Sequence, residues 1–131
     1  MSGIAKPEFA PLLAAGMHLM SMDDIEALCV SAFPQSTARS PIMAQLRTVV
    51  AALASAKISG SLWVDGSFLT KKVEPGDVDL CLCIRAEQLL CPKKANALHW
   101  FRHSAHALFP LCHPNLCFIA SPGMSDREKK N

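Results

Sequence analysis

The chain has 131 residues, of which half are hydrophobic and 18% are charged, and its net charge at pH 7 is +2. This composition excludes intrinsic disorder and gives a single domain enough apolar side chains for a core. The small net charge and the lack of tyrosine give little support for binding to a polynucleotide.

The first half of the chain predicts an irregular arm and two helices. Residues 1–20 contain Pro7, Pro11 and Gly16 and form the arm. Ser21 is a typical helix N-cap with acidic residues after it, so a helix runs from there to about residue 33. Ser40-Pro41 opens a second helix, with proline at its first helical position, and this helix ends near residue 58.

The second half predicts strands at residues 62–64, 77–84 and 116–120, and a helix from about residue 93 to 109 that two prolines bound. We therefore expect an α/β protein of the α+β type, with a short mixed sheet backed by helices. It divides into an arm (1–20), one domain (21–120) and a flexible tail (121–131).

The segment with the most chemical information is Gly66-Ser67 followed by Asp77-Val78-Asp79. Side chains alternate along a strand, so Asp77 and Asp79 project from the same face. Two neighbouring carboxylates repel each other unless a cation or a proton lies between them, and Mg²⁺ prefers such oxygen ligands. The glycine-serine turn offers backbone N–H groups and a hydroxyl to a phosphate. The sequence thus predicts a phosphate-and-metal site.

This segment resembles the signature of the DNA polymerase beta-type nucleotidyltransferase superfamily, in which Gly-Ser, a spacer and an Asp-x-Asp pair follow a strand. The order Asp65-Gly66-Ser67-Phe68, Pro75 before the acids, and the segment 16–21 resemble a small bacterial branch of it. The resemblance covers about residues 12–120. It implies a minimal nucleotidyltransferase-like fold in which Asp77 and Asp79 are catalytic and bind Mg²⁺ or Mn²⁺.

The resemblance also implies the partners. A nucleoside triphosphate such as ATP would donate a nucleotidyl group to an acceptor hydroxyl on a protein, a tRNA or a small molecule, in a toxin–antitoxin or phage-defence setting. Gly66 and Ser67 would bind the phosphates, and Lys71 and Lys72 lie in the loop within reach of them. Loop lysines are also commonly just solvated. Asp65 either orients the turn or faces solvent.

The superfamily needs a third carboxylate on a later strand, and this chain offers Asn115 there. An amide supplies a neutral oxygen and accepts no proton as a carboxylate does. The alternative function is therefore a catalytically degenerate module that binds a nucleotide or a partner protein.

A second metal site is the competing hypothesis. His99, His103 and His106 lie at i, i+4 and i+7 of one predicted helix, before Cys112 and His113, so a structural zinc site is possible there. A solvent-exposed helical face explains the same spacing.

The six cysteines predict reduced, mostly buried thiols, and Cys81 and Cys83 are badly placed to form a disulfide with each other. No apolar run of about 18 residues and no signal-peptide pattern occurs, so we expect a cytoplasmic protein without membrane contact.

Overall fold

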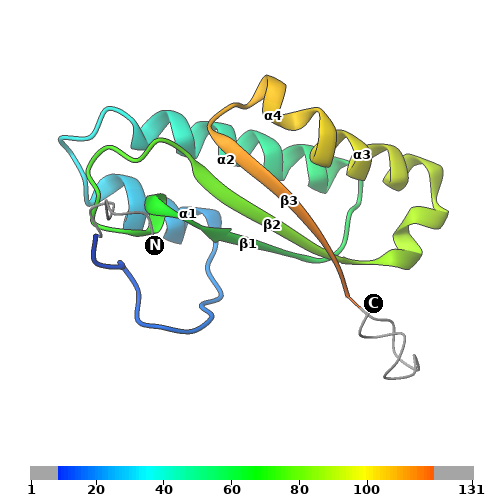
Figure 1. Cartoon of the computed structure of the whole chain (residues 1–131), viewed down its shortest axis with the longest axis horizontal. Coiled ribbons are helices and arrows are strands. Elements are labelled where there is room, and N and C mark those ends of the chain that lie inside the picture. Colours follow the sequence, from blue (N-terminus) through cyan, green and yellow to red (C-terminus); the bar gives the residue numbers. More distant parts are fainter. Residues whose placement is uncertain (1–8, 120–131) are drawn as a thin grey trace, which may run out of the picture.

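A three-stranded mixed sheet organises the chain in a computed structural model that describes residues 9–119 (Figure 1). The strands are β1 (Ser61–Asp65), β2 (Val78–Arg85) and β3 (Cys112–Ile119), and they lie in that order across the sheet. β1 runs antiparallel to β2, and β3 runs parallel to it. The predicted α+β class with a short mixed sheet is confirmed.

The helices lie mainly on one side of this sheet, where α2 and α3 run along one face in Figure 1. None of the helices within residues 9–119 has both the length and the apolar character needed to cross a bilayer. The helical elements in chain order are α1 (Met22–Glu26), the π-helical turn η1 (Ala27–Ser31), α2 (Arg39–Ser55), the 3₁₀ turns η2 (Ser67–Leu69) and η3 (Ala86–Leu90), α3 (Pro92–His103) and α4 (Ala105–Leu108).

The core forms between β2 and the helices because β2 alternates along its length. One face of β2 buries Val78, Leu80, Leu82 and Ile84, each at most 4% exposed. Full burial of such a side chain stabilises the fold by about 1.5–3 kcal/mol. The other face of the strand starts with Asp79 and points away from the helices. The same alternation that builds the core therefore presents polar side chains on the open face. The buried helical partners are Ile42, Leu46, Val49 and Leu53 of α2 and Leu98 and Phe101 of α3.

The helices start close to the residues that the sequence predicted, but two of them are interrupted where the sequence predicted one continuous helix. Ser21 caps α1, with a full capping box to Asp24, as its position predicted. The prediction of one regular helix to residue 33 was wrong, because the chain changes to a π-helical turn at Ala27. The predicted helix from 93 to 109 is also divided. Ser104, with φ −121°, departs from helical geometry and separates α3 from α4.

The last strand begins at Cys112, four residues before the predicted start. The predicted strand 116–120 did not include His113-Pro114-Asn115. Proline lacks the N–H that a central strand needs, but it is tolerated on an edge strand. β3 is such an edge, since only β2 pairs with it among the described strands. As a result Asn115 lies within the sheet, where it is the register partner of Cys81.

The arm within residues 9–20 is irregular, as predicted, yet it is anchored to the motif loop. Leu12 N–H donates to the carbonyl of Leu69, and Lys71 N–H donates to that of Ala10, both at 2.9 Å. These bonds hold the arm beside the segment that follows β1. Residues 1–8 of the predicted arm and the predicted tail 121–131 lie outside the described residues.

Candidate functional site

The turn after β1 lies directly against the acidic start of β2. Asp65, the last residue of β1, is the register partner of Asp79. Gly66 follows with φ +93°, in the left-handed region that favours glycine. A Cβ atom at Gly66 would lie 2.7 Å from Oδ2 of Asp79, which is closer than atoms approach without displacement. The two halves of the sequence motif are thus one packed unit, and glycine is required for it.

Replacement of Gly66 by alanine tests this close contact. The Gly66→Ala variant is expected to lose about 1–3 kcal/mol of unfolding free energy, because the new methyl group both strains the backbone and displaces Asp79. Urea unfolding measures the loss. Gly76→Ala is the matched control, since a Cβ atom there meets nothing within 4 Å. An equal stability change in the two variants would contradict the packing argument.

Three aspartates and a histidine gather at this end of the sheet. Asp77 comes immediately before β2, and its Oδ2 lies 4.0 Å from Nε2 of His113. His113 is also the register partner of Asp79 on β3. Partial burial, and then the charges of Asp77 and Asp65, raise the pKa of Asp79, while His113 lowers it. The site therefore carries repulsion that a bound cation would relieve.

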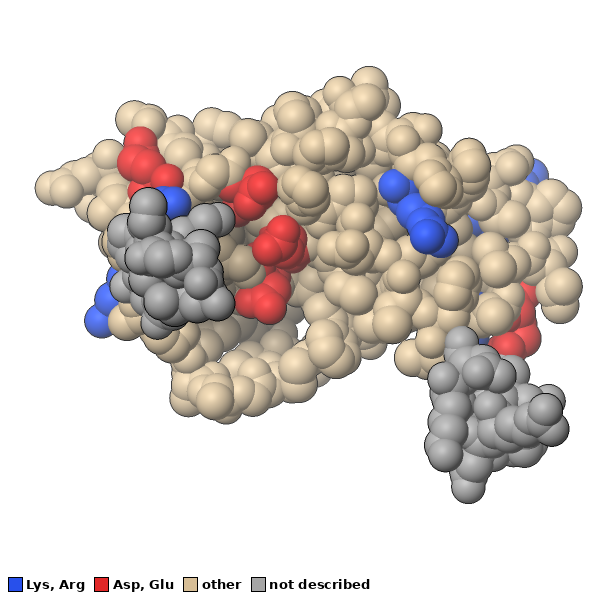
Figure 2. Space-filling view, viewed as in Figure 1, with Lys and Arg blue, Asp and Glu red and all other residues tan. Residues whose placement is uncertain are grey.

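Acidic side chains are visible together beside a hollow on this face of the molecule (Figure 2). Carboxylate oxygens are the ligands that Mg²⁺ and Mn²⁺ prefer. Within residues 9–119, only three cysteine thiols bring three potential metal ligands within 4.8 Å of one another, so the acids form a looser set. Their chemistry fits a hard divalent cation that also takes ligands from a phosphate, because such a cation needs few protein oxygens.

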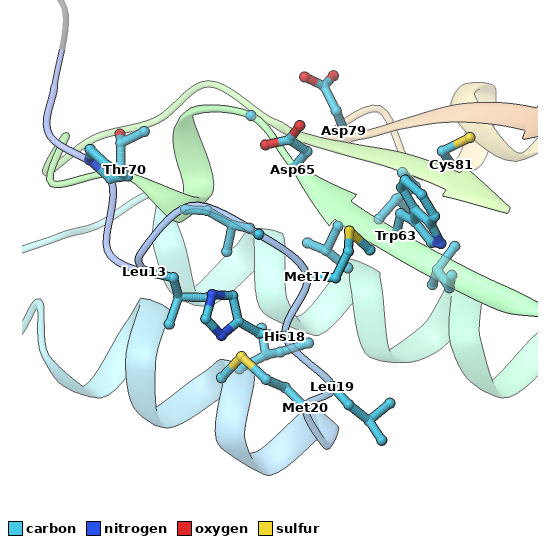
Figure 3. Close-up of a pocket in the computed structure, with 18 of the residues that line it drawn as sticks. Leu13, Met17, His18, Leu19, Met20, Trp63, Asp65, Thr70, Asp79 and Cys81 are labelled. Atoms are coloured by element: carbon cyan, nitrogen blue, oxygen red, sulfur yellow. The ribbon is translucent and has the colours of Figure 1, made fainter.

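A pocket of about 770 Å³ extends from Asp65 and Asp79 across the open face of the sheet, and Asp77 is not part of its lining. Its size is typical of small-molecule sites. In Figure 3 Asp65 and Asp79 lie at one end, and Trp63 lies further along β1. The arm covers the other side, with Met17 facing the sheet across the pocket. His18 also lines the pocket, but its ring turns back to the arm, where Nε2 lies 2.8 Å from the carbonyl oxygen of Ala14. Asn115, the register partner of Cys81, also lines the pocket. The sequence had not predicted the arm or Trp63 as parts of the site.

The predicted phosphate-binding residues are placed unequally. Gly66 lines the pocket, whereas Ser67, Lys71 and Lys72 do not. Ser67 starts η2, and its hydroxyl makes no hydrogen bond among the described residues. Lys72 Nζ lies 5.9 Å from the ring centroid of Phe9. The structure therefore puts Gly66 at the pocket, while Ser67 and the two lysines are not part of its lining.

Two long-range anchors that the sequence did not reveal fix the motif loop. Arg39, at the start of α2, is fully buried. Its guanidinium donates to the carbonyls of Phe68, Thr70 and Lys72 and to that of Cys29. The ring of Phe33 lies 3.7 Å from the guanidinium carbon.

Glu74 fixes the far end of the same loop. Its carboxylate accepts hydrogen bonds from the hydroxyls of Ser36 and Thr37 and from the N–H groups of Thr37 and Ala38. These bonds lower the pKa of Glu74 from 4.5 to about 2. The loop between the turn and the acids is held from both sides, so the acids start from a fixed position.

A pH dependence of stability follows from Glu74. A carboxylate with a depressed pKa stabilises the fold above its unfolded pKa, and the contribution is lost as the pH falls through the folded value. The Glu74→Gln variant is expected to be less stable than the wild type at pH 6, with the difference shrinking between pH 4.5 and 2. Urea midpoints at several pH values measure it, and Glu26→Gln, at a partly exposed ion pair with Arg47, serves as the control. A difference that stays constant with pH would contradict the assignment.

The histidines do not form the face that their spacing predicted. His99 and His103 stack on α3 with ring centroids 4.5 Å apart, while His106 pairs with His113 at 4.7 Å. The break at Ser104 separates the two pairs. His106 Nδ1 also lies 3.0 Å from the carbonyl of Cys112. In the described part of the chain, no histidine belongs to a convergent set of three metal ligands.

Comparison with family models gives one match, which spans residues 7–127 and is described as "Family of unknown function (DUF6932)". Comparison with the curated proteins gives no match, and comparison with the solved structures gives none either. The chemistry of the site must therefore be inferred from its own side chains.

Proposed function

The chain belongs to this family of unknown function, DUF6932, and from its site we propose that it is a Mg²⁺- or Mn²⁺-dependent nucleotidyltransferase. The observation that carries the proposal is the contact of the Gly66 turn with Asp79, beside Asp77, at the end of a pocket of about 770 Å³. The turn and the acid pair are the two parts of the motif that resembles the polymerase beta-type superfamily.

Asp65 supplies the third carboxylate that Asn115 lacks. As the register partner of Asp79, it faces the same side of the sheet, and its charge contributes to the raised pKa of Asp79. Directly opposed residues of an antiparallel pair have Cβ atoms about 4.5–5.5 Å apart, within the span of one or two shared cations. The proposed site therefore has three carboxylates, Asp65, Asp77 and Asp79. Its third carboxylate comes from β1, whereas in the superfamily it comes from a later strand.

The reaction joins an acceptor hydroxyl oxygen to the α-phosphorus of a nucleoside triphosphate and breaks the bond to pyrophosphate. The divalent cation, when bound, neutralises the triphosphate and the leaving group. Asp77 and Asp79 hold it. Asp65 accepts the proton of the attacking hydroxyl, and the Gly66–Ser67 turn orients the phosphates.

Incubation of the full chain with each labelled nucleoside triphosphate, Mg²⁺ or Mn²⁺, and protein, tRNA or small hydroxyl acceptors tests the proposal. We expect metal-dependent release of pyrophosphate and a labelled acceptor, neither of which appears with the Asp77→Asn/Asp79→Asn variant. Transfer by that double variant at the wild-type rate would overturn the assignment of the acids. The absence of transfer with every nucleotide and acceptor class would overturn the enzymatic proposal.

Trp63 is the proposed platform for the nucleobase. Its indole is 47% exposed and lines the pocket two residues before Asp65 on the same face of β1. Stacking of a base on an aromatic side chain contributes about 1–3 kcal/mol. Trp63→Leu is therefore expected to weaken nucleotide binding about 5- to 100-fold in fluorescence or calorimetric titrations, with little change in kcat. Leu108→Ala, an exposed apolar residue outside the pocket, is the control. Equal affinity of Trp63→Leu and the wild type would place the base elsewhere.

The second candidate is a degenerate module that binds a nucleotide without transferring it. Asn115 favours this candidate, because it lines the pocket where the superfamily resemblance places an acid. Metal-dependent nucleotide binding without pyrophosphate release would distinguish it from the enzyme. An Asn115→Asp variant that gains transfer would locate the missing function at that residue.

A further inference from the structure

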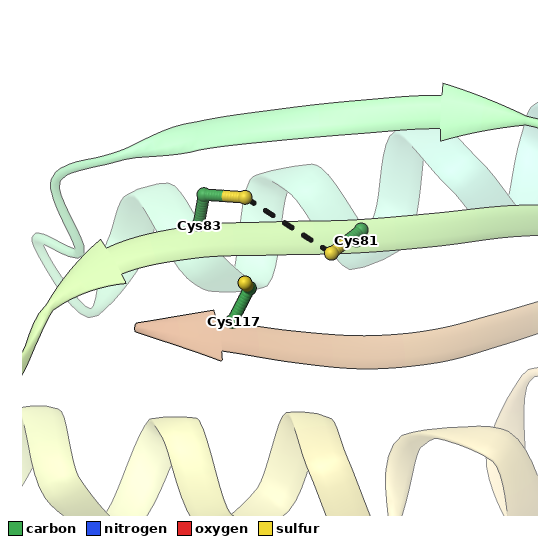
Figure 4. Close-up of side chains that lie close together, drawn as sticks. All are labelled: Cys81, Cys83 and Cys117. Atoms are coloured by element: carbon green, nitrogen blue, oxygen red, sulfur yellow. Dashed lines mark hydrogen bonds between the residues drawn. The ribbon is translucent and has the colours of Figure 1, made fainter. Parts of the chain in front are cut away.

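Three cysteine side chains meet on the open face of the sheet, beyond the acids. Cys81 and Cys83 are two residues apart on β2, so both project from the same face, the one opposite the helices. Cys117 of β3 is the register partner of Cys83 and projects from the same face. Figure 4 shows the three sulfur atoms close together in front of the strands. All three cysteines are free thiols.

The spacing of the sulfur atoms suits one metal ion. Sγ of Cys81 lies 4.0 Å from Sγ of Cys83, and all three sulfurs lie within 4.8 Å of one another. Thiolates bound to one ion with metal–sulfur bonds of about 2.3 Å lie roughly 3.8 Å apart in a tetrahedral site and roughly 4.0 Å apart in a trigonal one. Closing the triangle therefore takes shifts of less than about 1 Å, which rotation of exposed side chains such as Cys117 supplies.

We propose that Cys81, Cys83 and Cys117 form a binding site for a thiophilic d¹⁰ metal ion, Zn²⁺ or Cu(I). Thiolate ligands select such ions over Mg²⁺ and Ca²⁺. Cys117 is exposed, so a position opposite the sheet is open to water or an external ligand, as in a zinc site with three protein ligands. Cys81 also lines the pocket beside Asp79, but the thiol site uses none of the carboxylates and stands whether or not the chain transfers nucleotides.

The three thiols already interact in the metal-free protein. Burial first, and then the neighbouring thiols of Cys81 and Cys117, raise the pKa of Cys83 to about 11. A cation bound between closely packed thiols favours their ionised form. A disulfide between Cys81 and Cys83 is disfavoured, because residues two apart on a strand have Cα atoms about 6.6 Å apart and parallel Cβ directions.

Titration of the reduced full chain with Zn²⁺, Cu(I) and Co²⁺ tests the site. We expect one tightly bound equivalent of Zn²⁺ or Cu(I), and sulfur-to-metal charge-transfer absorption with Co²⁺. A four-coordinate Co²⁺ spectrum with preference for Zn²⁺ would identify the tetrahedral form, and preference for Cu(I) the trigonal form. Excess Mg²⁺ should displace neither ion.

Variants locate the binding. Cys117→Ser, which changes an exposed residue, should weaken binding at least about 100-fold and remove most of the charge-transfer band. Cys91→Ser, at an exposed cysteine outside the cluster, should change neither, and Asp79→Asn should also leave the band intact. Circular dichroism reports folding, and Cys81→Ser provides a second ligand variant if Cys117→Ser unfolds. Unchanged metal affinity in a folded ligand variant would overturn the proposal. Metal binding without sulfur ligation would also overturn it. So would rapid oxidation of the wild type to a Cys83–Cys117 disulfide in place of metal binding.

Discussion

Replacement of Asp79 by asparagine is expected to reduce nucleotidyl transfer by about 10³-fold while making the metal-free protein more stable. The loss of activity follows because asparagine keeps the shape of the side chain and removes the charge that holds the cation. Removal of one preorganised electrostatic group costs an enzyme on the order of 10²–10³ in kcat. Initial rates of labelled transfer at saturating Mg²⁺ measure this effect.

The same substitution is expected to raise stability although it lowers activity, and the reason is the repulsion among the aspartates. Partial burial, and then the charges of Asp77 and Asp65, raise the pKa of Asp79, so its ionised form is disfavoured in the folded, metal-free protein. Like charges that face each other across paired strands cost about 0.2–1 kcal/mol, which corresponds to a few degrees in Tm. Added Mg²⁺ should stabilise the wild type more than Asp79→Asn, because the variant has less repulsion to relieve.

The control for both measurements is Asp23→Asn, which changes an exposed carboxylate that pairs with Arg47 and does not line the pocket. It should keep full activity and gain no stability. If Asp79→Asn lost activity and also lost stability, the aspartate would have a structural role in the sheet and its assignment as a metal ligand would be wrong.

The sequence predicted the site best where its residues are close along the chain. Gly66, Asp77 and Asp79 belong to one segment of two strands and a loop, and alternation alone placed the acid face and the core face of β2. The structure then joined the turn to Asp79 through a contact that leaves no room for a Cβ atom. Local patterns determine such a unit, because each of its parts is within fifteen residues of the others.

The remaining parts of the site depend on pairing between distant segments, which no local pattern encodes. The role of Asp65 follows from its register with Asp79, and that of Asn115 from an edge strand that begins before Pro114. Trp63 was read only as a strand residue, although it faces the pocket that the arm covers. The cysteine cluster likewise requires β3 to lie beside β2 in one particular register. A single sequence does not specify these registers, since they result from tertiary packing.

The buried guanidinium of Arg39 gives the largest expected effect on stability. Polar residues surround Arg39 in the sequence, which is typical of an exposed helix start, yet the side chain is 0% exposed. It serves four backbone carbonyls, three of them in or beside the motif loop. Its Nε has no hydrogen-bond partner among the described residues, and burial lowers the pKa of the group. Burying the Arg39 guanidinium therefore costs free energy, and the hydrogen bonds that it donates to the motif loop offset this cost.

Arg39→Met is therefore expected to lower the unfolding free energy by about 3–5 kcal/mol, because the methionine fills much of the space but leaves the carbonyls without donors. Arg39→Lys should recover only part of the loss, since an ammonium group lacks the planar fork that reaches carbonyls on several sides. Urea unfolding at pH 7 measures both. Arg47→Met on the same helix is the control, where exposed ion pairs with Asp23 and Glu26 contribute at most about 1 kcal/mol. If Arg39→Met and Arg47→Met were equally stable, the motif loop would be held by Glu74 and the arm alone, and the acids would keep their geometry without the buried cation.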